Sequence, residues 1–529
     1  MRVFNYPLKN TLRAWTAVFL FVPLVAAIFT GSSALADIPA FLGSLAFTTV
    51  LCALPALIGM PRWLAAPYYV LANLLAMVVL YVVLITGDFP SLATCLATLK
   101  TDSAEAGETL RATAWAIGVS VGVWVTQLPG CLSFLKKAPE LKFKWPRLRI
   151  LALAPLATPM FMASVAETYP AHLAQLAVQT KYYHDAGNKV DMSDNYKVSQ
   201  AKQLSSPELV VFVLGESSRA SFWQIYGYNQ PTSPNMAKRA ADGDLLVFKR
   251  HMSTVAATRF AVPTMVTPFG ELFPVKGKSR PSLITIMNRA GYSTGWLSVQ
   301  GPLPVTSEAN ESNFTWDDDV FGTNDRYDSR LLPQATKWIK AHESKPSFLL
   351  LHTAGSHIPF EARYPKSFAK WHDYEDLKYP KSQTVHNYLN TILYTDSILE
   401  SFIQSMEKEQ RPVLLVYVSD HGESAMENIS RDHAPSTVNV LHVPFLVWAN
   451  SAWRESRSEQ WKALKAQTQA QWTTSHINIT PTLTSALTID YAGKPEELDI
   501  LSNSFKQWKT TPALNLRNMT REEAVPPNP

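Results

Sequence analysis

The chain has 529 residues, of which 47% are hydrophobic and 17% are charged, and its formal net charge is +5. So small a charge on so long a chain gives no support for nucleic-acid binding, and the length allows two or three domains. The composition is uneven, because apolar residues concentrate before about residue 168 and charged residues and histidines after it.

Five apolar stretches are long enough to cross a bilayer, and they cover residues 14–30, 41–60, 67–87, 112–131 and 150–165. The first stretch can also be interpreted as a secretory signal, because Arg13 precedes it and the small residues at 33–36 resemble a cleavage site. We expect it to be retained, since four further spans follow it.

Basic residues in the loops predict the orientation. The loop between spans four and five carries six lysines and arginines, and Arg2, Lys9 and Arg13 lie at the N-terminus. Such residues mark cytoplasmic segments, so everything after span five is predicted to lie outside the cytoplasm. The predicted organisation is a transmembrane domain of about five helices over 1–168, a membrane-surface connector or plain polar linker over 169–206, and a periplasmic or extracellular domain over 207–529.

The cysteines restrict the chemistry of any metal site. Cys52, Cys95 and Cys131, the only three, all lie in the apolar first third. The rest of the chain therefore has no disulfide and no thiolate ligand, so a metal there must be held by histidines, carboxylates and hydroxyls.

The polar part of the chain alternates short apolar runs with longer mixed segments, which is typical of an α/β fold with a mainly parallel sheet. The predicted strands are residues 209–214, 294–298, 348–352, 413–419 and 444–448.

Three of these strands end in groups that can hold a metal or a phosphate. The first leads to Glu216, the third to His357, and the fourth to Asp420 and His421. Ligands bind at the carboxyl ends of strands in such sheets. An isolated Asp-His pair more often lies in a solvated turn, but three such strand ends favour a site for a dication such as zinc. Gly422 would let the backbone turn sharply beneath it.

Five segments, in this order along the chain, carry a resemblance to a known family: VVFVLGESSRASFWQIYGYNQPTSPNM, TRFAVPTM, GSHIPF, SDHGES and RDHAP. They resemble the lipopolysaccharide-type phosphoethanolamine transferases, membrane-anchored enzymes of the alkaline phosphatase/sulfatase superfamily. The resemblance extends over nearly the whole chain, including TDSAEA at 101–106. It implies a five-helix transmembrane domain followed by an alkaline phosphatase/sulfatase-like α/β domain.

The resemblance also implies site roles at matching positions. Thr258, five residues before the proline of VPTM, would be the nucleophile and a metal ligand. Glu216, Asp420 and His421 would be the other ligands. From spacing alone, Thr254 and its neighbours compete with Thr258, and Glu216 could instead be an acid at a helix N-terminus.

Four further residues receive less direct roles. By the resemblance, His357 and His433 would hold the phosphate or a second metal. Glu423 would orient His421. Glu105 would face the donor head group, although a solvated loop acid is an equal alternative. His352 is interpreted as a core residue, and His442 and His476 as structural.

The family pattern is not matched everywhere. Relatives often carry several disulfides in this domain, and Arg259 and Phe260 stand where relatives have small residues. The local shape of the site, and with it the choice of donor or acceptor, is therefore expected to differ.

The function implied is transfer of phosphoethanolamine from phosphatidylethanolamine to an envelope glycolipid or glycan, such as lipopolysaccharide core, lipid A or a periplasmic glucan. One or two zinc ions and a phospho-threonine intermediate are implied, with the enzyme in the bacterial inner membrane and its catalytic domain in the periplasm. Alternatives are a phosphoglycerol transferase, a phosphodiesterase, or a catalytically inactive membrane-tethered sensor. A formylglycine-dependent sulfatase is disfavoured, because no Cys- or Ser-x-Pro-x-Arg segment occurs.

Overall fold

The structure, a computed structural model of the chain, describes residues 61–86, 110, 113–122, 125, 197–200, 204–267, 281–314, 327–372, 383–423, 438–515 and 520–526. These residues belong to two compact units, which are described separately. The domain boundaries at 168 and 206 stay predictions.

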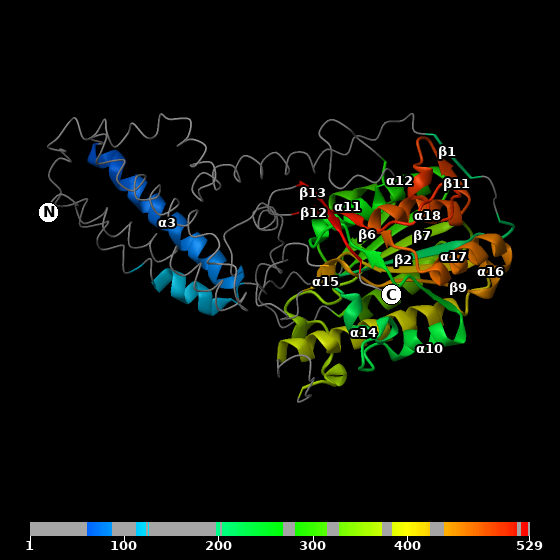
Figure 1. The fold of residues 1–529 in the computed structure, drawn as a ribbon, viewed down its shortest axis with the longest axis horizontal. Coiled ribbons are helices and arrows are strands. Elements are labelled where there is room, and N and C mark those ends of the chain that lie inside the picture. The colour runs from blue at the N-terminus through cyan, green and yellow to red at the C-terminus, as the bar shows by residue number, and fades with distance from the viewer. Residues whose placement is uncertain are drawn as a thin grey trace. The chain divides into compact units, whose positions relative to one another are not determined.

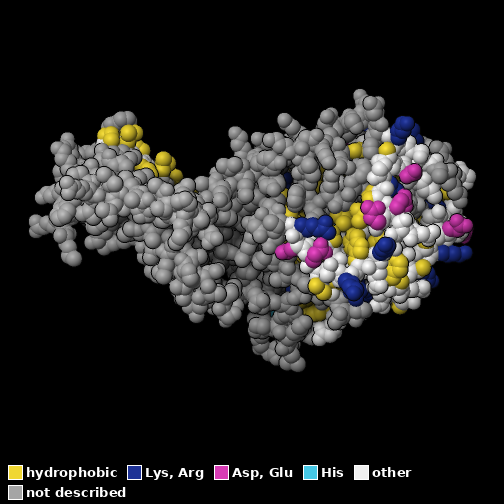
Figure 2. All heavy atoms as spheres, turned by 45° about the horizontal axis from the view of Figure 1, so that its top comes forward, with side chains coloured by type: hydrophobic (Ala, Val, Ile, Leu, Met, Phe, Trp, Pro, Cys, Tyr) yellow, Lys and Arg dark blue, Asp and Glu magenta, His cyan; other side chains and the backbone are white. Residues whose placement is uncertain are grey.

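The first unit contains helix α3 (Arg62–Thr86), which overlaps the third predicted span (Figure 1). Its buried side chains include Ala65, Tyr69, Asn73 and Ala76, spaced three or four residues apart along one face. Leucines and valines such as Leu71 are exposed, and hydrophobic side chains of this unit are visible at the surface in Figure 2. A hydrogen bond of 2.8 Å joins the hydroxyls of Tyr81 and Thr113, just before the helical residues 114–122.

Within the described ranges, no helix is both long enough and apolar enough to cross a membrane. The first, second and fifth predicted spans lie outside the described residues.

The second unit is built on a seven-stranded sheet with the strand order β3-β9-β8-β2-β7-β5-β6. Its strands are β2 (Leu209–Gly215), β3 (Leu245–Val247), β5 (Ser293–Ser298), β6 (Glu311–Phe314), β7 (Ser347–His352), β8 (Val413–Ser419) and β9 (Phe445–Ala449). Three two-stranded ribbons surround it: β1 (Val198–Gln200) with β11 (Ile489–Tyr491), β4 (His251–Met252) with β10 (Thr474–Ser475), and β12 (Thr511–Asn515) with β13 (Thr520–Ala524).

All five predicted strands are present, with boundaries that differ by at most one residue. Strands β8, β2, β7, β5 and β6 pair in parallel, so the prediction of a mainly parallel sheet is confirmed. The sheet is nevertheless mixed, because β9 pairs antiparallel with both β8 and β3. Strand direction depends on how the chain returns to the sheet, which the apolar pattern of β9 does not encode.

Helices cover both faces of the sheet, as Figure 1 shows. One face carries α10 (Pro234–Asp242), α13 (Leu331–Ala341) and α14 (Gln383–Met406). The other carries α11 (Thr258–Val266), α12 (Leu283–Arg289), α16 (Ser451–Ser456), α17 (Ser458–Ala470) and α18 (Ile479–Ala486). The short helix α15 (Val438–Leu441) packs in a smaller apolar cluster. The 3₁₀ helices are η3 (Ala220–Phe222), η4 (Gln224–Tyr226), η5 (Pro304–Glu308), η6 (Asp328–Arg330), η7 (Phe360–Ala362), η8 (Lys366–Phe368), η9 (His476–Asn478) and η10 (Glu496–Leu498).

The central strands are apolar throughout because both of their faces are covered. Alternate residues of β2 enter opposite cores: Leu209, Val211 and Val213 pack on one side, and Val210 and Phe212 on the other. This continuous burial holds β2 rigidly, so the residue that follows it has a defined position.

A buried ion pair anchors the start of β2. Glu208, the residue before the strand, accepts hydrogen bonds from Arg457 Nε at 3.0 Å and Nη2 at 2.5 Å, and from the Tyr292 hydroxyl at 2.6 Å. Glu208 and Arg457 are almost fully buried. The pair thus ties the sheet to the residue that joins α16 and α17.

We predict that Arg457→Met lowers the free energy of unfolding by about 3–5 kcal/mol, because it leaves the Glu208 carboxylate buried without its cation. Urea unfolding of the full chain in detergent, followed by tryptophan fluorescence, measures this. The matched control is Arg521→Met, whose ion pair with Glu523 is exposed, and it should change the value by less than about 0.5 kcal/mol. Equal effects of the two variants would contradict the prediction.

Candidate metal centre and active site

The pairing of β2 with β8 brings two carboxylates together. Gly215 pairs with Ser419, so the next residues, Glu216 and Asp420, leave the sheet side by side. The Asp420 amide donates to the Gly215 carbonyl at 3.0 Å, which extends this pairing by one step. Both acidic side chains are fully buried. Two of the three predicted strand ends therefore converge.

The segment after β7, the third of the predicted strand ends, packs closely against the backbone of Glu216. The Ser356 amide donates to the Glu216 carbonyl at 2.9 Å. Gly355 has a φ of +48°, and a Cβ there would lie 2.6 Å from the Glu216 carbonyl oxygen, so only glycine permits this approach. The next histidine, His357, is half-buried, and its Nδ1 donates to the Ile358 carbonyl at 2.7 Å.

Thr258 is the first residue of α11, and its hydroxyl reaches the same point. Its Oγ1 lies 3.1 Å from Glu216 Oε2 and 3.3 Å from His421 Nε2. The structure thus brings together Thr258, Glu216, Asp420 and His421, the four residues predicted as metal ligands. Thr254, the nearby alternative, instead shares a 2.7 Å hydrogen bond with the Thr264 hydroxyl.

Ligand atoms of Glu216, Asp420 and His421 lie within 4.8 Å of one another. Around a tetrahedral zinc ion with bonds of about 2.0–2.1 Å, neighbouring ligand atoms are about 3.3–3.4 Å apart. His421 Nε2 lies 3.4 Å from Asp420 Oδ2 and 3.6 Å from Glu216 Oε1, so the spacing matches this geometry closely.

The hydrogen bonding of Asp420 and His421 supports the same conclusion. Asp420 Oδ2 is buried and has no hydrogen-bond partner, which is costly unless a ligand takes that position. His421 Nδ1 donates to the Gly422 carbonyl at 2.9 Å, so Nε2 faces the carboxylates and would offer its lone pair to a cation that displaces its proton. The donor set of two carboxylates, an imidazole and a hydroxyl fits a dication such as zinc.

The charges of the cluster are coupled. Burial opposes ionisation of Glu216, but the positive charges of His421 and His357 outweigh it and hold its pKa at about 2. Burial and the charge of Glu216 raise the pKa of Asp420 to about 7. For His421, burial disfavours the charged ring, yet Asp420, Glu216 and Glu423 raise its pKa above 6.5. The carboxylates therefore need a positive charge between them, from the imidazolium or from a bound cation.

The remaining predicted site residues have varied outcomes. His433 and Glu105 lie outside the described residues. Glu423 is buried and acts on His421 by its charge, while the hydrogen bond from His421 Nδ1 goes to the Gly422 carbonyl. Among the described residues, His357 belongs to no group of side chains that could jointly hold an ion, although its charge acts on Glu216.

The sulfatase family matches residues 208–489, which is more than half of the chain and contains this site. The chain belongs to the sulfatase family. The match covers the sheet, the helices on both faces and all the described candidate ligands.

Within the sulfatase family, the similar proteins include several phosphoethanolamine transferases, as the motifs predicted. Phosphoethanolamine transferase EptA of Helicobacter pylori is 31% identical over 265 residues, which cover 48% of this chain and 50% of that protein. The chain spans about half the length of the curated relatives that it matches first.

Two solved structures share the fold. The integral membrane protein lipooligosaccharide phosphoethanolamine transferase A (EptA) from Neisseria meningitidis has a TM-score of 0.71 at 21% identity, covering 92% of this chain and 97% of that one. The C-terminal periplasmic domain of EcEptC from Escherichia coli, in complex with Zn, has a TM-score of 0.53 at 21% identity, covering 60% of this chain and 91% of that domain.

One residue of this sulfatase-family site escaped the sequence interpretation. Gln300, two residues after β5, donates from Nε2 to Glu216 Oε2 at 3.0 Å and to the Thr353 carbonyl at 2.5 Å. It also contacts His352 Nε2 at 3.1 Å. His352 is buried as predicted, yet Gln300 connects it to a ligand. Applying the strand-end rule to the second predicted strand, residues 294–298, would have found Gln300.

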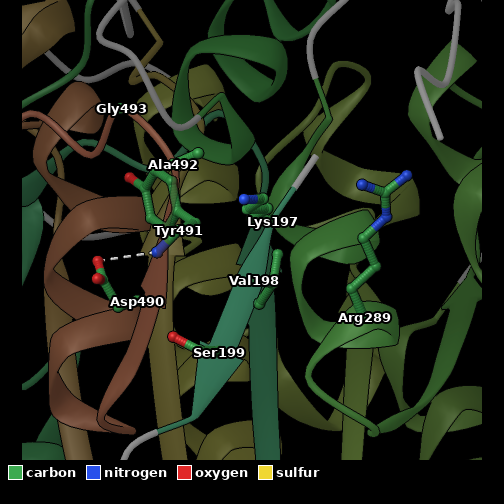
Figure 3. A pocket seen from close by; sticks show the side chains of 8 residues that line it. All are labelled: Lys197, Val198, Ser199, Arg289, Asp490, Tyr491, Ala492 and Gly493. Carbon is green, nitrogen blue, oxygen red and sulfur yellow. Dashed lines mark hydrogen bonds between the residues drawn. The ribbon is translucent and has the colours of Figure 1, made fainter. Parts of the chain in front are cut away.

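A groove of about 1020 Å³ lies elsewhere in this sulfatase-family unit, beside the β1–β11 ribbon and the end of α12. Figure 3 shows its lining residues: Lys197, Val198, Ser199, Arg289, Asp490, Tyr491, Ala492 and Gly493. None of them is a candidate catalytic residue. Arg289 ends α12 just before β5 begins, so the groove lies toward the amino end of that strand, away from the metal centre.

Several histidines outside the metal centre are buried in uncharged form. Burial lowers the pKa of His442 to about 4 and that of His476 to about 3. His442 Nε2 donates to the Lys249 carbonyl at 2.8 Å, and His476 Nε2 donates to the Ser419 carbonyl at 3.1 Å. These contacts agree with the structural roles predicted for both.

The low pKa of His476 makes stability depend on pH. Between about pH 3 and pH 6.5, His476 binds a proton in the unfolded chain but not in the folded chain. The contribution of its neutral form to the free energy of unfolding is therefore fully present above pH 6.5 and is lost as the pH falls toward 3. We predict that His476→Gln, which keeps an Nε2 donor for the Ser419 carbonyl, reduces the pH dependence of the unfolding free energy by up to about 1.4 kcal/mol per pH unit. Urea titrations at pH 4–6.5 measure the difference, and an unchanged slope would contradict it.

Proposed function

We propose that this chain is a zinc-dependent phosphoethanolamine transferase that uses phosphatidylethanolamine as donor and an envelope glycolipid or glycan as acceptor. The observation that carries the proposal is the Thr258 hydroxyl, 3.1 Å from Glu216 and 3.3 Å from His421 at the edge of the candidate metal centre. The phosphoethanolamine transferases among its relatives, and the zinc complex of one of them, support the same activity.

Glu216, Asp420 and His421 would hold the zinc ion, with Thr258 as the fourth group. A zinc ion bound there would lower the pKa of the threonine hydroxyl and neutralise charge on the donor phosphate. The hydrogen bond from Thr258 to Glu216 orients the hydroxyl. Thr258 also begins α11, and the partial positive charge of a helix N-terminus favours an anionic group beside it.

The proposed reaction has two steps, both at Thr258 Oγ1. In the first, Oγ1 attacks the donor phosphorus, the bond from phosphorus to the diacylglycerol oxygen breaks, and the threonine proton ends on the departing diacylglycerol. Phosphoethanolamine then remains on Thr258 as a phosphodiester. In the second, an acceptor hydroxyl or phosphate attacks the same phosphorus, and Thr258 leaves with its hydroxyl restored.

The approach of the donor gives the apolar N-terminal residues a role in this proposal. The acyl chains of the donor cannot leave the bilayer without a large hydrophobic cost, so the catalytic unit must work at the membrane surface. We propose the organisation stated from the sequence: a multi-pass inner-membrane domain over 1–168, a connector over 169–206 and a periplasmic catalytic domain over 207–529. The membrane fold of the Neisseria meningitidis relative, which covers 92% of this chain, supports it.

The first test looks for the covalent phosphoethanolamine-threonine intermediate. Purified full-length protein is incubated with phosphatidylethanolamine in mixed micelles and zinc, and the Thr258 peptide is analysed by mass spectrometry. Thr258→Ala should abolish the phosphoethanolamine adduct and lower transfer by roughly 10³-fold or more, because the nucleophile is removed. Thr258→Ser should retain an adduct.

The matched control is Thr254→Ala, which removes a buried hydroxyl four residues away in the same loop. It should retain the adduct. A phosphoethanolamine adduct on the Thr258→Ala protein would refute the assignment of Thr258 as the nucleophile. So would an adduct that is lost in Thr254→Ala and kept in Thr258→Ala.

The second test separates the proposed donor from its alternatives. Vesicles carry either phosphatidylethanolamine or phosphatidylglycerol with identical acyl chains, and diacylglycerol release is measured with and without an acceptor glycolipid. We predict release from phosphatidylethanolamine alone, with the head group recovered on the acceptor. Release from phosphatidylglycerol would identify a phosphoglycerol transferase, and release into water at the full rate without acceptor would identify a phosphodiesterase.

A further inference from the structure

We propose that Ser217 is the positioning residue that pre-organises both carboxylate ligands, and that it sets the affinity of the site for zinc. This inference rests on the proposed zinc site but does not need the transfer reaction. Ser217 follows Glu216 directly and is fully buried. It touches the ligands, not the reacting atoms.

The backbone of Ser217 is in an unfavourable conformation. Its φ is +54°, one of three positive values for non-glycine residues among the described residues. A residue with a Cβ adopts this conformation only at an energetic cost, so the surrounding structure must hold it there. Strain of this kind at a strand end points to a function for the resulting geometry.

The left-handed turn gives Ser217 a hydrogen bond to each ligand. Its amide donates to Asp420 Oδ1 at 2.9 Å, and its hydroxyl donates to Glu216 Oε1 at 2.7 Å. One residue therefore links acids that come from two different strands, β2 and β8. The donors also offset the repulsion between two buried carboxylates when no cation is present.

The two hydrogen bonds fix the orientation of both carboxylates. With Oδ1 of Asp420 held by the Ser217 and His421 amides, its Oδ2 is left without a protein partner. The Ser217 hydroxyl also holds Oε1 of Glu216, which places that oxygen 3.6 Å from His421 Nε2 and leaves Oε2 3.1 Å from Thr258 Oγ1. Each carboxylate is thus fixed by one hydrogen-bonded oxygen before an ion binds, which lowers the entropy lost on binding.

Tyr388, on the helix α14 that covers one face of the sheet, holds the turn in place. The Tyr388 hydroxyl, on α14, donates to the Ser217 carbonyl at 2.7 Å and accepts from the Arg219 amide at 2.9 Å. Ser218 in the same turn faces away from the ligands, because its hydroxyl accepts from Trp223 Nε1 at 2.8 Å and its amide donates to Ser419 Oγ. Of these two adjacent buried serines, Ser217 is the one whose amide and hydroxyl contact the ligands.

Three variants of the full-length protein in detergent test the inference, with zinc itself as the probe. Ser217→Ala removes the hydroxyl and keeps the strained φ, Ser217→Gly removes both the hydroxyl and the strain, and Ser218→Ala is the matched control. Zinc affinity is measured by competition with a fluorescent chelator, and the melting temperature of the metal-free protein is measured separately. No donor lipid is present, so the result is independent of whether the chain transfers phosphoethanolamine.

We expect both Ser217 variants to bind zinc about 10–100-fold more weakly, as for other residues that orient metal ligands. Ser217→Gly should melt at a higher temperature than Ser217→Ala, because glycine adopts a positive φ without cost, yet it should not regain zinc affinity. Ser218→Ala should bind zinc as the wild type does, whatever its melting temperature.

Two results would overturn the inference. The first is wild-type zinc affinity in Ser217→Ala. The second is a loss of affinity that follows the loss of melting temperature across all three variants, because that pattern would mean that Ser217 only supports the fold.

Discussion

Two buried carboxylates of like charge, placed side by side by the pairing of two central strands, are the constraint around which this molecule is arranged. Glu216 and Asp420 have no exposed surface, so water cannot screen them, and their repulsion in a low-dielectric interior is large. Ser217, Gln300 and Thr258 supply hydrogen-bond donors to them, and His421 supplies a positive charge. A dication is the ligand that satisfies it most completely.

The sheet supplies the precision that such a site requires. Strands β2 and β8 are covered on both faces, and the ion pair of Glu208 with Arg457 anchors the beginning of β2. The candidate metal ligands then stand on short segments just beyond rigid strands, the common solution for sites that need exact geometry. The nucleophile candidate comes from a different direction, on the first turn of α11. The site therefore forms only when β2, β8 and α11 have all packed.

Membership of the sulfatase family explains the scaffold without determining the chemistry. The family match covers residues 208–489, yet no Cys- or Ser-x-Pro-x-Arg segment for a formylglycine occurs in the chain. Thr258 lies at the candidate metal centre instead. Function depends on the groups placed on a fold, so the same sheet and carboxylates can support transfer of a different group once the nucleophile changes.

The local sequence predicted much of this architecture, because its signals act over a few residues. Runs such as VLLVYVS are apolar at every position, which a strand buried on both faces requires. The residues just beyond them, Glu216, Asp420 and His421, could be identified from their place after those runs. Thr258 could not be chosen over Thr254 from spacing alone, and it was the resemblance to a known family that pointed to it.

The sequence by itself thus determined which segments form the central strands and which chemical groups follow them. Only the tertiary structure decided the antiparallel direction of β9, the role of Gln300 and the double hydrogen bond of Ser217 to two ligands. Strand register, a left-handed turn and a side chain arriving from another strand are set by packing between residues far apart in the chain. Ser217 and Asp420 are 203 residues apart in the chain, and no local sequence pattern extends over that distance.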